Sequence, residues 1–328
     1  MESKMIIVTG GAGFIGSAIV AQLNRKGRED ILIVDCLGCD EKWKNLRKLR
    51  YTDYLEKDAF LEQVKLGRIQ APVQAIFHMG ACSSTTEKDA SYLAVNNFEY
   101  TKTLCQWAVS DRIQFIYASS AATYGDGEKG FVDDEKRLDE LIPLNIYGYS
   151  KQMFDQWAKR QGLLGKIVGL KFFNVFGPNE YHKGDMRSFI LKSFEQIKTC
   201  GKVRLFKSHR SDYGDGEQVR DFIYVKDAAA MAMYFFENKE VRGIFNIGTG
   251  KARSWNDLVK ATFAAMGKKP DIEYVEMPEN IRSQYQYFTQ ADISKILRAG
   301  YKAPIQSLES AVDDYVKNYL AVTEYLGG

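Results

Sequence analysis

The feature that most constrains the fold is a glycine-rich turn near the start of the chain. Gly10, Gly13 and Gly16 lie between an apolar, β-branched run at 5–9 and a stretch with helical periodicity at 14–26. In this arrangement one glycine permits a tight turn, one lets a pyrophosphate approach the backbone, and one allows the helix to pack closely on the sheet. A helix N-terminus also offers free N–H groups to phosphates. The turn therefore predicts a dinucleotide-binding site.

The first half of the chain alternates apolar strand-like runs with helix-like segments. A helix is expected over 93–110, and the expected strands are 5–9, 31–35, 75–78 and 114–118. Unbroken apolar strands separated by helices indicate a parallel sheet that is covered on both faces. The predicted fold class is α/β: a Rossmann-type doubly wound parallel sheet with a smaller α/β substrate-binding domain.

The pattern loosens after residue 172 and sets the expected domain boundaries. The dinucleotide-binding domain is predicted to comprise 1–172 plus about 221–247. The substrate-binding domain is expected to take mainly about 173–220 and 248–328. Ligands of a doubly wound sheet bind beyond the carboxyl ends of the strands, so the site is expected there.

Composition limits the functional classes. A net charge of +3 gives no support for nucleic-acid binding. No apolar stretch approaches the roughly 20 residues of a membrane span, so no membrane partner is expected. Cys36 and Cys39 form a CxxC pair, but the chain has only three histidines and five cysteines. We expect no metal site, and the thiols are interpreted as reduced, in a cytoplasmic protein.

A second group of residues carries acid/base chemistry. Tyr147 and Lys151 are four residues apart, so on a helix they share a face. A lysine ammonium near the tyrosine hydroxyl would lower the tyrosine pKa and make it a base. Ser120 follows the strand expected at 114–118, where its hydroxyl can bond the same substrate oxygen.

These motifs resemble the extended short-chain dehydrogenase/reductase family, in its nucleotide-sugar epimerase branch, along the whole chain. The resemblance implies that Ser120, Tyr147 and Lys151 are catalytic and that Lys183 is a second acid/base. The segments that carry it are 77–86 (FHMGACSSTT), 117–125 (YASSAATYG), 144–151 (LNIYGYSK), 172–178 (FFNVFGP), 182–184 (HKG), 220–225 (RDFIYV) and 288–292 (FTQAD).

The resemblance also implies one tightly bound NADP per subunit, with NAD as the alternative. Asp35, at the end of the second strand, favours a free ribose hydroxyl and hence NAD. Lys42 and Lys57, however, match positions that meet a 2′-phosphate. The full set of expected cofactor residues is Gly10, Gly11, Gly13, Phe14, Ile15, Gly16, Asp35, Cys36, Lys42, Lys57, Met79, Gly80, Ala81, Cys82, Ser83, Asn96, Tyr147, Lys151, Val175 and Lys183.

The implied substrate is an ADP-linked heptose, inverted at C6 by transient oxidation and reduction from the opposite face. Arg220 is expected to contact the diphosphate, with an ion pair to Asp221 as the alternative reading. Asp185 and Lys192 depart from the residue types usual at those positions. The expected substrate residues are Ser120, Asn174, Asp185, Lys192, Phe206, Lys207, Ser208, His209, Arg220 and Tyr285. A homo-oligomer, such as a pentamer, is also implied.

Three other functions are weighed. A UDP-hexose 4-epimerase shares the same first half and stays open. A sugar-nucleotide 4,6-dehydratase needs an acid and a base directly after Ser120, where this chain has Ala121 and Ala122. A non-catalytic dinucleotide-binding regulator would not need the intact set of serine, tyrosine and lysine.

Overall fold

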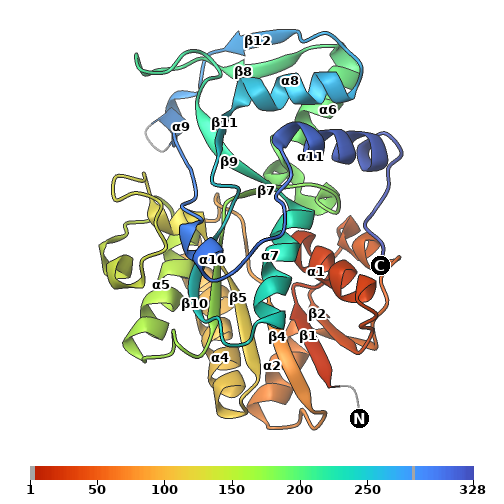
Figure 1. Ribbon diagram of the computed structural model, residues 1–328, viewed down its shortest axis with the longest axis vertical. Coiled ribbons are helices and arrows are strands. Elements are labelled where there is room, and N and C mark those ends of the chain that lie inside the picture. The colour runs from red at the N-terminus through yellow and green to blue at the C-terminus, as the bar shows by residue number, and fades with distance from the viewer. Residues whose placement is uncertain (1–3, 283–284) are drawn as a thin grey trace.

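The computed structural model describes residues 4–282 and 285–328 (Figure 1). Its largest element is a parallel sheet of seven strands in the order β10-β6-β5-β4-β1-β2-β3. The strands are β1 (Met5–Thr9), β2 (Ile31–Asp35), β3 (Asp53–Glu56), β4 (Val73–His78), β5 (Gln114–Ser120), β6 (Val168–Phe172) and β10 (Gly243–Ile247). The predicted fold class is confirmed.

Side chains from both faces of the sheet are buried, which explains the unbroken apolar strands. Ile6 and Val8 of β1 belong to a core shared with α1 (Phe14–Arg25) and α7 (Val225–Glu237). Ile7, which points to the other face, belongs to a core shared with α2 (Lys57–Lys65), α4 (Tyr100–Ser110) and α5 (Ile146–Arg160). The helices therefore cover the sheet on both sides.

The strand order defines where a ligand binds. From β1 the chain runs outward to β2 and β3, and it then crosses back to β4 on the other side of β1. The crevice at the carboxyl ends of β1 and β4 is the topological switch point, at which doubly wound sheets hold their ligands.

A smaller unit lies beyond the carboxyl ends of the main sheet (Figure 1). One small sheet contains β7 (Asn174–Phe176), β9 (Val219–Tyr224) and β11 (Ala252–Ser254), and another pairs β8 (Val203–Phe206) with β12 (Ile272–Val275). Three helices pack here: α6 (Phe189–Cys200), α8 (Trp255–Ala265) and α11 (Leu308–Tyr315).

The chain crosses between the two parts more than once. Residues 225–247 return to the main sheet as α7 and β10, whereas 221–224 lie in β9 and pair with the small unit. The later helix α10 (Ser294–Arg298) packs against β10, where the Lys295 ammonium donates to the Ile244 carbonyl. The domain boundaries drawn from the sequence stay a prediction.

Short elements complete the part of the chain that the structure describes. They are η1 (Glu41–Leu46), α3 (Ala90–Leu93), the π-helical η2 (Ala94–Glu99), η3 (Ala121–Tyr124), η4 (Glu135–Glu140), η5 (Tyr181–Met186), α9 (Glu279–Arg282) and the π-helical η6 (Val316–Leu320). Among the described residues, no helix has the length and apolar character needed to cross a membrane.

Candidate active site

The glycine turn has no room for side chains at two of its positions. Gly10 has a φ of 67°, and a Cβ there would lie 2.6 Å from the amide nitrogen of Gly80. A Cβ on Gly16 would lie 2.0 Å from the carbonyl oxygen of Gly10. Helix α1 begins after Gly13, which supplies no side-chain cap, so its first N–H groups are available to a ligand. The geometry fits the phosphate cradle expected from the sequence.

Almost all the expected cofactor residues line two adjoining pockets. The larger, of about 490 Å³, is lined by Gly10, Gly13, Phe14, Ile15, Gly16, Asp35, Lys42, Met79, Gly80, Ala81, Cys82, Ser83, Tyr147, Lys151, Val175 and Lys183, among others. Cys36, Lys57 and Asn96 line the smaller pocket, of about 280 Å³. Gly11 lines neither pocket, and a Cβ there would meet the Val8 carbonyl oxygen at 2.8 Å.

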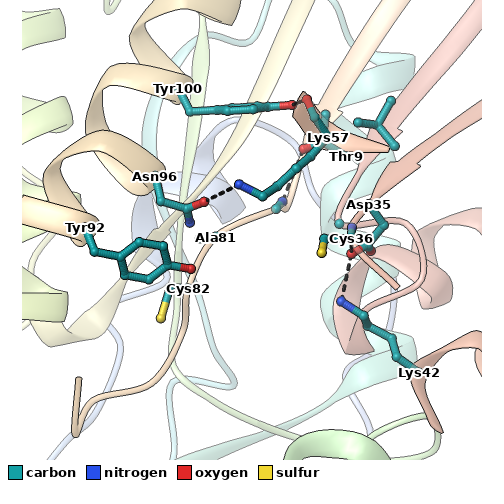
Figure 2. A pocket seen from close by; sticks show the side chains of 13 residues that line it. Thr9, Asp35, Cys36, Lys42, Lys57, Ala81, Cys82, Tyr92, Asn96 and Tyr100 are labelled. Carbon is teal, nitrogen blue, oxygen red and sulfur yellow. Dashed lines mark hydrogen bonds and ion pairs between the residues drawn. The ribbon is translucent and has the colours of Figure 1, made fainter. Parts of the chain in front are cut away.

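Two lysines face the smaller pocket from different elements (Figure 2). The Lys42 ammonium lies 2.8 Å from Asp35 Oδ1, and the Lys57 ammonium donates to Asn96 Oδ1 at 3.0 Å. Asp35 also accepts from the backbone N–H groups of Ala12 and Cys36. Its carboxylate is thus held by the glycine turn and by one lysine.

The expected catalytic trio comes together at the end of β5. Ser120 is the last residue of β5 and forms a side-chain hydrogen bond with Tyr147, which lies in the first turn of α5. That helix is capped by Asn145, whose side chain accepts from Gly148 N at 2.8 Å. Lys151 lies one turn further along α5, and both Tyr147 and Lys151 line the larger pocket.

The pKa of Tyr147 differs from the expectation. Burial raises the pKa of the Tyr147 hydroxyl, and the hydrogen bond with Ser120 opposes that rise. The Lys151 ammonium donates instead to the Ala118 carbonyl at 2.8 Å. Burial lowers the pKa of Lys151 to about 8. The prediction that Lys151 lowers the pKa of Tyr147 is therefore wrong, because the Lys151 ammonium bonds to a strand carbonyl instead.

Lys183 reaches the same pocket from the opposite part of the fold. It lies in η5, and its ammonium is 5.1 Å from the centroid of the Phe14 ring at the start of α1. Burial lowers the pKa of Lys183, and the nearby Glu180 opposes that shift. Two amines with a depressed pKa, Lys151 and Lys183, thus line the same pocket as the Ser120 and Tyr147 hydroxyls.

A buried polar chain that the sequence did not single out supports the pocket. Thr101 Oγ1 donates to the Asn97 carbonyl at 2.5 Å, so it accepts from His78 Nε2 at 2.8 Å. The remaining nitrogen, Nδ1, then accepts from Thr9 Oγ1 at 2.6 Å. Burial lowers the pKa of His78 to about 3, which keeps the ring neutral. Asn97 in turn bonds both backbone groups of Cys82. No local pattern marks these residues.

A third pocket, of about 410 Å³, continues from the catalytic residues toward the smaller unit. It shares Ser120 and Tyr147 with the larger pocket, and Asn174, Arg220 and Tyr285 line it. Other lining residues, which the sequence analysis did not assign, are Thr85, Thr86, Leu144, Phe173, Gln286 and Thr289. The three pockets therefore place the expected catalytic residues between two binding regions.

Arg220 is a buried cation that no described carboxylate pairs with. Its guanidinium donates to the carbonyls of Val219 and Gln286 and lies 5.2 Å from the Tyr285 ring centroid. Asp221 accepts instead from Thr249, Gly250 and Ala291. The ion pair weighed as an alternative is therefore not formed, and the structure leaves the charge of Arg220 available to an anion.

Six expected substrate residues do not line these pockets. The Lys192 ammonium donates to the Asp185 carbonyl at 2.7 Å. Phe206 contacts the Tyr285 ring edge-on, with centroids 6.5 Å apart. The other three, Lys207, Ser208 and His209, lie in the loop after β8, where Lys207 pairs with Glu276. Their substrate roles stay predictions.

Comparison with known proteins identifies the family. The model of the NAD dependent epimerase/dehydratase family matches residues 6–248. The chain belongs to this family. The resemblance drawn from the sequence motifs is thus confirmed.

Proteins named ADP-L-glycero-D-manno-heptose-6-epimerase are similar over nearly their whole length. The one from Nitratidesulfovibrio vulgaris is 54% identical over 98% of this chain and 99% of that protein. The one from Fusobacterium nucleatum is 50% identical over 97% and 98%. Among solved structures, the enzyme of that name from Helicobacter pylori has a TM-score of 0.80 at 27% identity, covering 97% of this chain and 96% of that chain. UDP-glucose 4-epimerase from Thermotoga maritima has a TM-score of 0.77 at 25% identity, covering 97% and 99%.

Proposed function

We propose that this protein is an ADP-glyceromanno-heptose 6-epimerase, which interconverts ADP-D-glycero-D-manno-heptose and ADP-L-glycero-D-manno-heptose. The observation that carries the proposal is the position of Ser120 and Tyr147, which line both the pocket of the glycine turn and the pocket of Arg220. A sugar that spans the two would present a hydroxyl to both side chains. The names and coverage of the relatives support the heptose as substrate.

The residues of the cleft suit oxidation and reduction of a secondary alcohol. A bound nicotinamide dinucleotide supplies the hydride acceptor and donor. Tyr147 removes the hydroxyl proton, and Ser120 holds the same oxygen by a hydrogen bond. Lys151, whose ammonium is held by the Ala118 carbonyl, lines the same pocket as Tyr147 and supplies a positive charge there.

Inversion requires that the carbonyl be reduced from its opposite face. At C6 of a heptose the carbonyl lies outside the ring, so rotation about one bond exchanges its faces. The second face then needs a second proton donor. Lys183 suits this role because it comes from a different element than Tyr147, and burial lowers its pKa and eases proton transfer.

Arg220 is proposed to bind the diphosphate. A planar guanidinium forms bidentate hydrogen bonds with phosphate oxygens. Because no described carboxylate neutralises Arg220, a bound diphosphate would compensate a charge that is otherwise buried without an ionic partner.

NADP is the proposed cofactor, one per subunit and tightly bound. Asp35 already accepts hydrogen bonds from two backbone N–H groups and from Lys42. These donors partly compensate its negative charge, so the carboxylate repels a 2′-phosphate less strongly. Lys57 adds a second cation to the same pocket. We further propose a cytoplasmic homo-oligomer, such as a pentamer, that serves lipopolysaccharide heptose synthesis.

One assay tests the function against its alternatives. The purified protein is incubated with either C6 epimer of ADP-heptose, and the products are separated by chromatography; UDP-glucose is tested in parallel. Formation of the other heptose epimer is the expected result. Turnover of UDP-glucose alone would make the protein a hexose 4-epimerase. No turnover of either would favour a binding protein.

A further inference from the structure

Behind the catalytic residues lies a fully buried ion pair. Asp155 of α5 and Lys171 of β6 are joined at 2.8 Å, and the side chains of both have no exposed surface. Neither residue lines any of the three pockets described above. A buried ion pair is weak evidence for stability, because desolvation of both charges offsets their attraction. Its contacts therefore need another explanation.

The carboxylate of Asp155 attaches the catalytic helix to the catalytic strand. It accepts hydrogen bonds from Tyr117 Oη and Ser119 Oγ, both at 2.8 Å. These two residues precede Ser120 on β5, and Asp155 lies one helical turn beyond Lys151 on α5.

The ammonium of Lys171 contacts η3, the short helix that directly follows β5. It donates to Thr123 Oγ1 at 2.6 Å, and that hydroxyl donates to the Ser120 carbonyl at 2.8 Å. It also lies 5.1 Å from the centroid of the Tyr124 ring. The ion pair therefore contacts two hydroxyls before Ser120, those of Tyr117 and Ser119, and one after it, that of Thr123.

We propose that the Asp155–Lys171 pair is a positioning device that fixes Ser120 against Tyr147 and sets the charge environment of Lys151. The proposal deepens the proposed function and rests on it. Misplacement by about 1 Å can reduce a rate by roughly 10²-fold, so a device that fixes this spacing affects turnover more than substrate binding.

The electrostatic part of the proposal concerns Lys151. Burial lowers its pKa to about 8, whereas the charge of Asp155 raises it. His78, on which Lys151 acts electrostatically, is kept neutral by burial and adds no charge of its own. Removing the charge of Asp155 should lower the pKa of Lys151 further, so activity that depends on its ammonium should be lost at lower pH.

The central test is the double variant Asp155→Asn/Lys171→Met, which removes both charges and leaves no unpaired buried ion. We expect kcat to fall by roughly 10- to 100-fold, with KM nearly unchanged. The pH profile is measured on Asp155→Asn alone, because removal of Lys171 as well would largely cancel the change in charge near Lys151; its alkaline limb should move to lower pH. The matched control is Asp314→Asn/Lys226→Met, which removes another lysine–aspartate pair, one whose residues line none of the three pockets.

Two single variants keep the test decisive if the double variant does not fold. Ser119→Ala and Thr123→Val leave the ion pair intact and each remove one hydroxyl that links it to β5. Each is expected to lower kcat with little change in thermal midpoint. A crystal structure would show whether the hydrogen bond between Ser120 and Tyr147 is lost, a result that does not depend on the substrate.

The outcomes separate this inference from the proposed function. If the unaltered protein epimerises ADP-heptose and the folded variants keep its kcat, its pH profile and the hydrogen bond, the pair is only structural and the inference is overturned. If the unaltered protein does not turn over ADP-heptose, the proposed function fails instead. Loss of the hydrogen bond in the variants would then still support the positioning role.

Discussion

Replacement of Lys183 by Met is the sharpest test of the two-base mechanism. Lys183→Met keeps much of the aliphatic length and removes the amine that faces the Phe14 ring. If this amine transfers the proton on the face opposite to Tyr147, kcat should fall by roughly 10²-fold or more. That loss corresponds to about 2.7 kcal/mol in the activation free energy.

The effect on stability should be smaller than the effect on rate. The substitution removes a cation–π contact, which contributes about 0.5–1 kcal/mol at an exposed site and about 2 kcal/mol where the groups are desolvated. Burial opposes its charge, however, as the direction of its pKa shift indicates, and removal of that charge offsets part of the loss. Glu180, its nearby carboxylate, keeps hydrogen bonds from Ser188 and Tyr315. The thermal midpoint should therefore change by about 2–4 °C or less.

The assay measures kcat and KM for ADP-heptose, together with the thermal midpoint. Lys198→Met, on an exposed part of α6, serves as the control for the loss of one lysine charge. A phosphate-binding role for Lys183 would raise KM and leave kcat nearly normal. That result would refute the acid/base assignment and leave the epimerase proposal standing.

Four further predictions concern the same cleft. Tyr147→Phe should keep the fold and the bound cofactor and lose roughly 10²-fold or more in kcat; a near-normal rate would remove Tyr147 from the mechanism. Mass spectrometry of cofactor released from denatured protein should find NADP, and Lys57→Gln should weaken NADP binding more than NAD binding; recovery of NAD alone would contradict this. Arg220→Gln should raise KM more than it lowers kcat, and equal losses in both would argue against a diphosphate contact. Because burial lowers the pKa of Lys151 to about 8, its ammonium is lost as pH rises through that value; kcat should fall there, and a flat profile to pH 10 would contradict a need for the charge.

The main sheet and the catalytic trio were predictable because both leave local patterns. Unbroken apolar strands identify a sheet covered on two faces, and a spacing of four residues places Tyr147 and Lys151 on one helix face. The small sheets were not predicted in this detail. Strands β7, β8 and β12 have only three or four residues, and so short a run has no clear period.

Properties that depend on tertiary contacts could not be derived from spacing. The pKa of Tyr147 depends on its burial and on where the Lys151 ammonium points, and that direction is set by the Ala118 carbonyl on another element. Likewise, Arg220 has no ion pair with Asp221 because the Asp221 carboxylate accepts hydrogen bonds from Thr249 instead. Neighbouring residues of opposite charge look like an ion pair in a sequence, whereas on a strand their side chains point to opposite faces.

The proposed role of Lys183 could be predicted only from the resemblance to a family, and not from a local sequence pattern. Its loop has no periodic pattern, yet the loop is attached directly to the glycine turn. The side chain of Asn45 donates to the carbonyls of Ala12 and Asn179, and Asn179 Nδ2 donates to Ser17 Oγ in α1. Asn179 has a φ of 76°, a left-handed conformation that asparagine adopts more readily than most residues.

These contacts make the glycine turn and the loop that carries Lys183 parts of one connected structure. The backbone at Asn179 is four residues from Lys183, and the buried Glu180 between them accepts from Ser188 and Tyr315. A shift of the glycine turn would therefore move Lys183 with it, while the Asp155–Lys171 pair holds Ser120 and Tyr147 on the other side of the cleft. A reaction that transfers protons on both faces of one carbon needs its two bases at a fixed separation. The two proposed bases, Tyr147 and Lys183, thus lie on segments that are held by separate sets of buried hydrogen bonds.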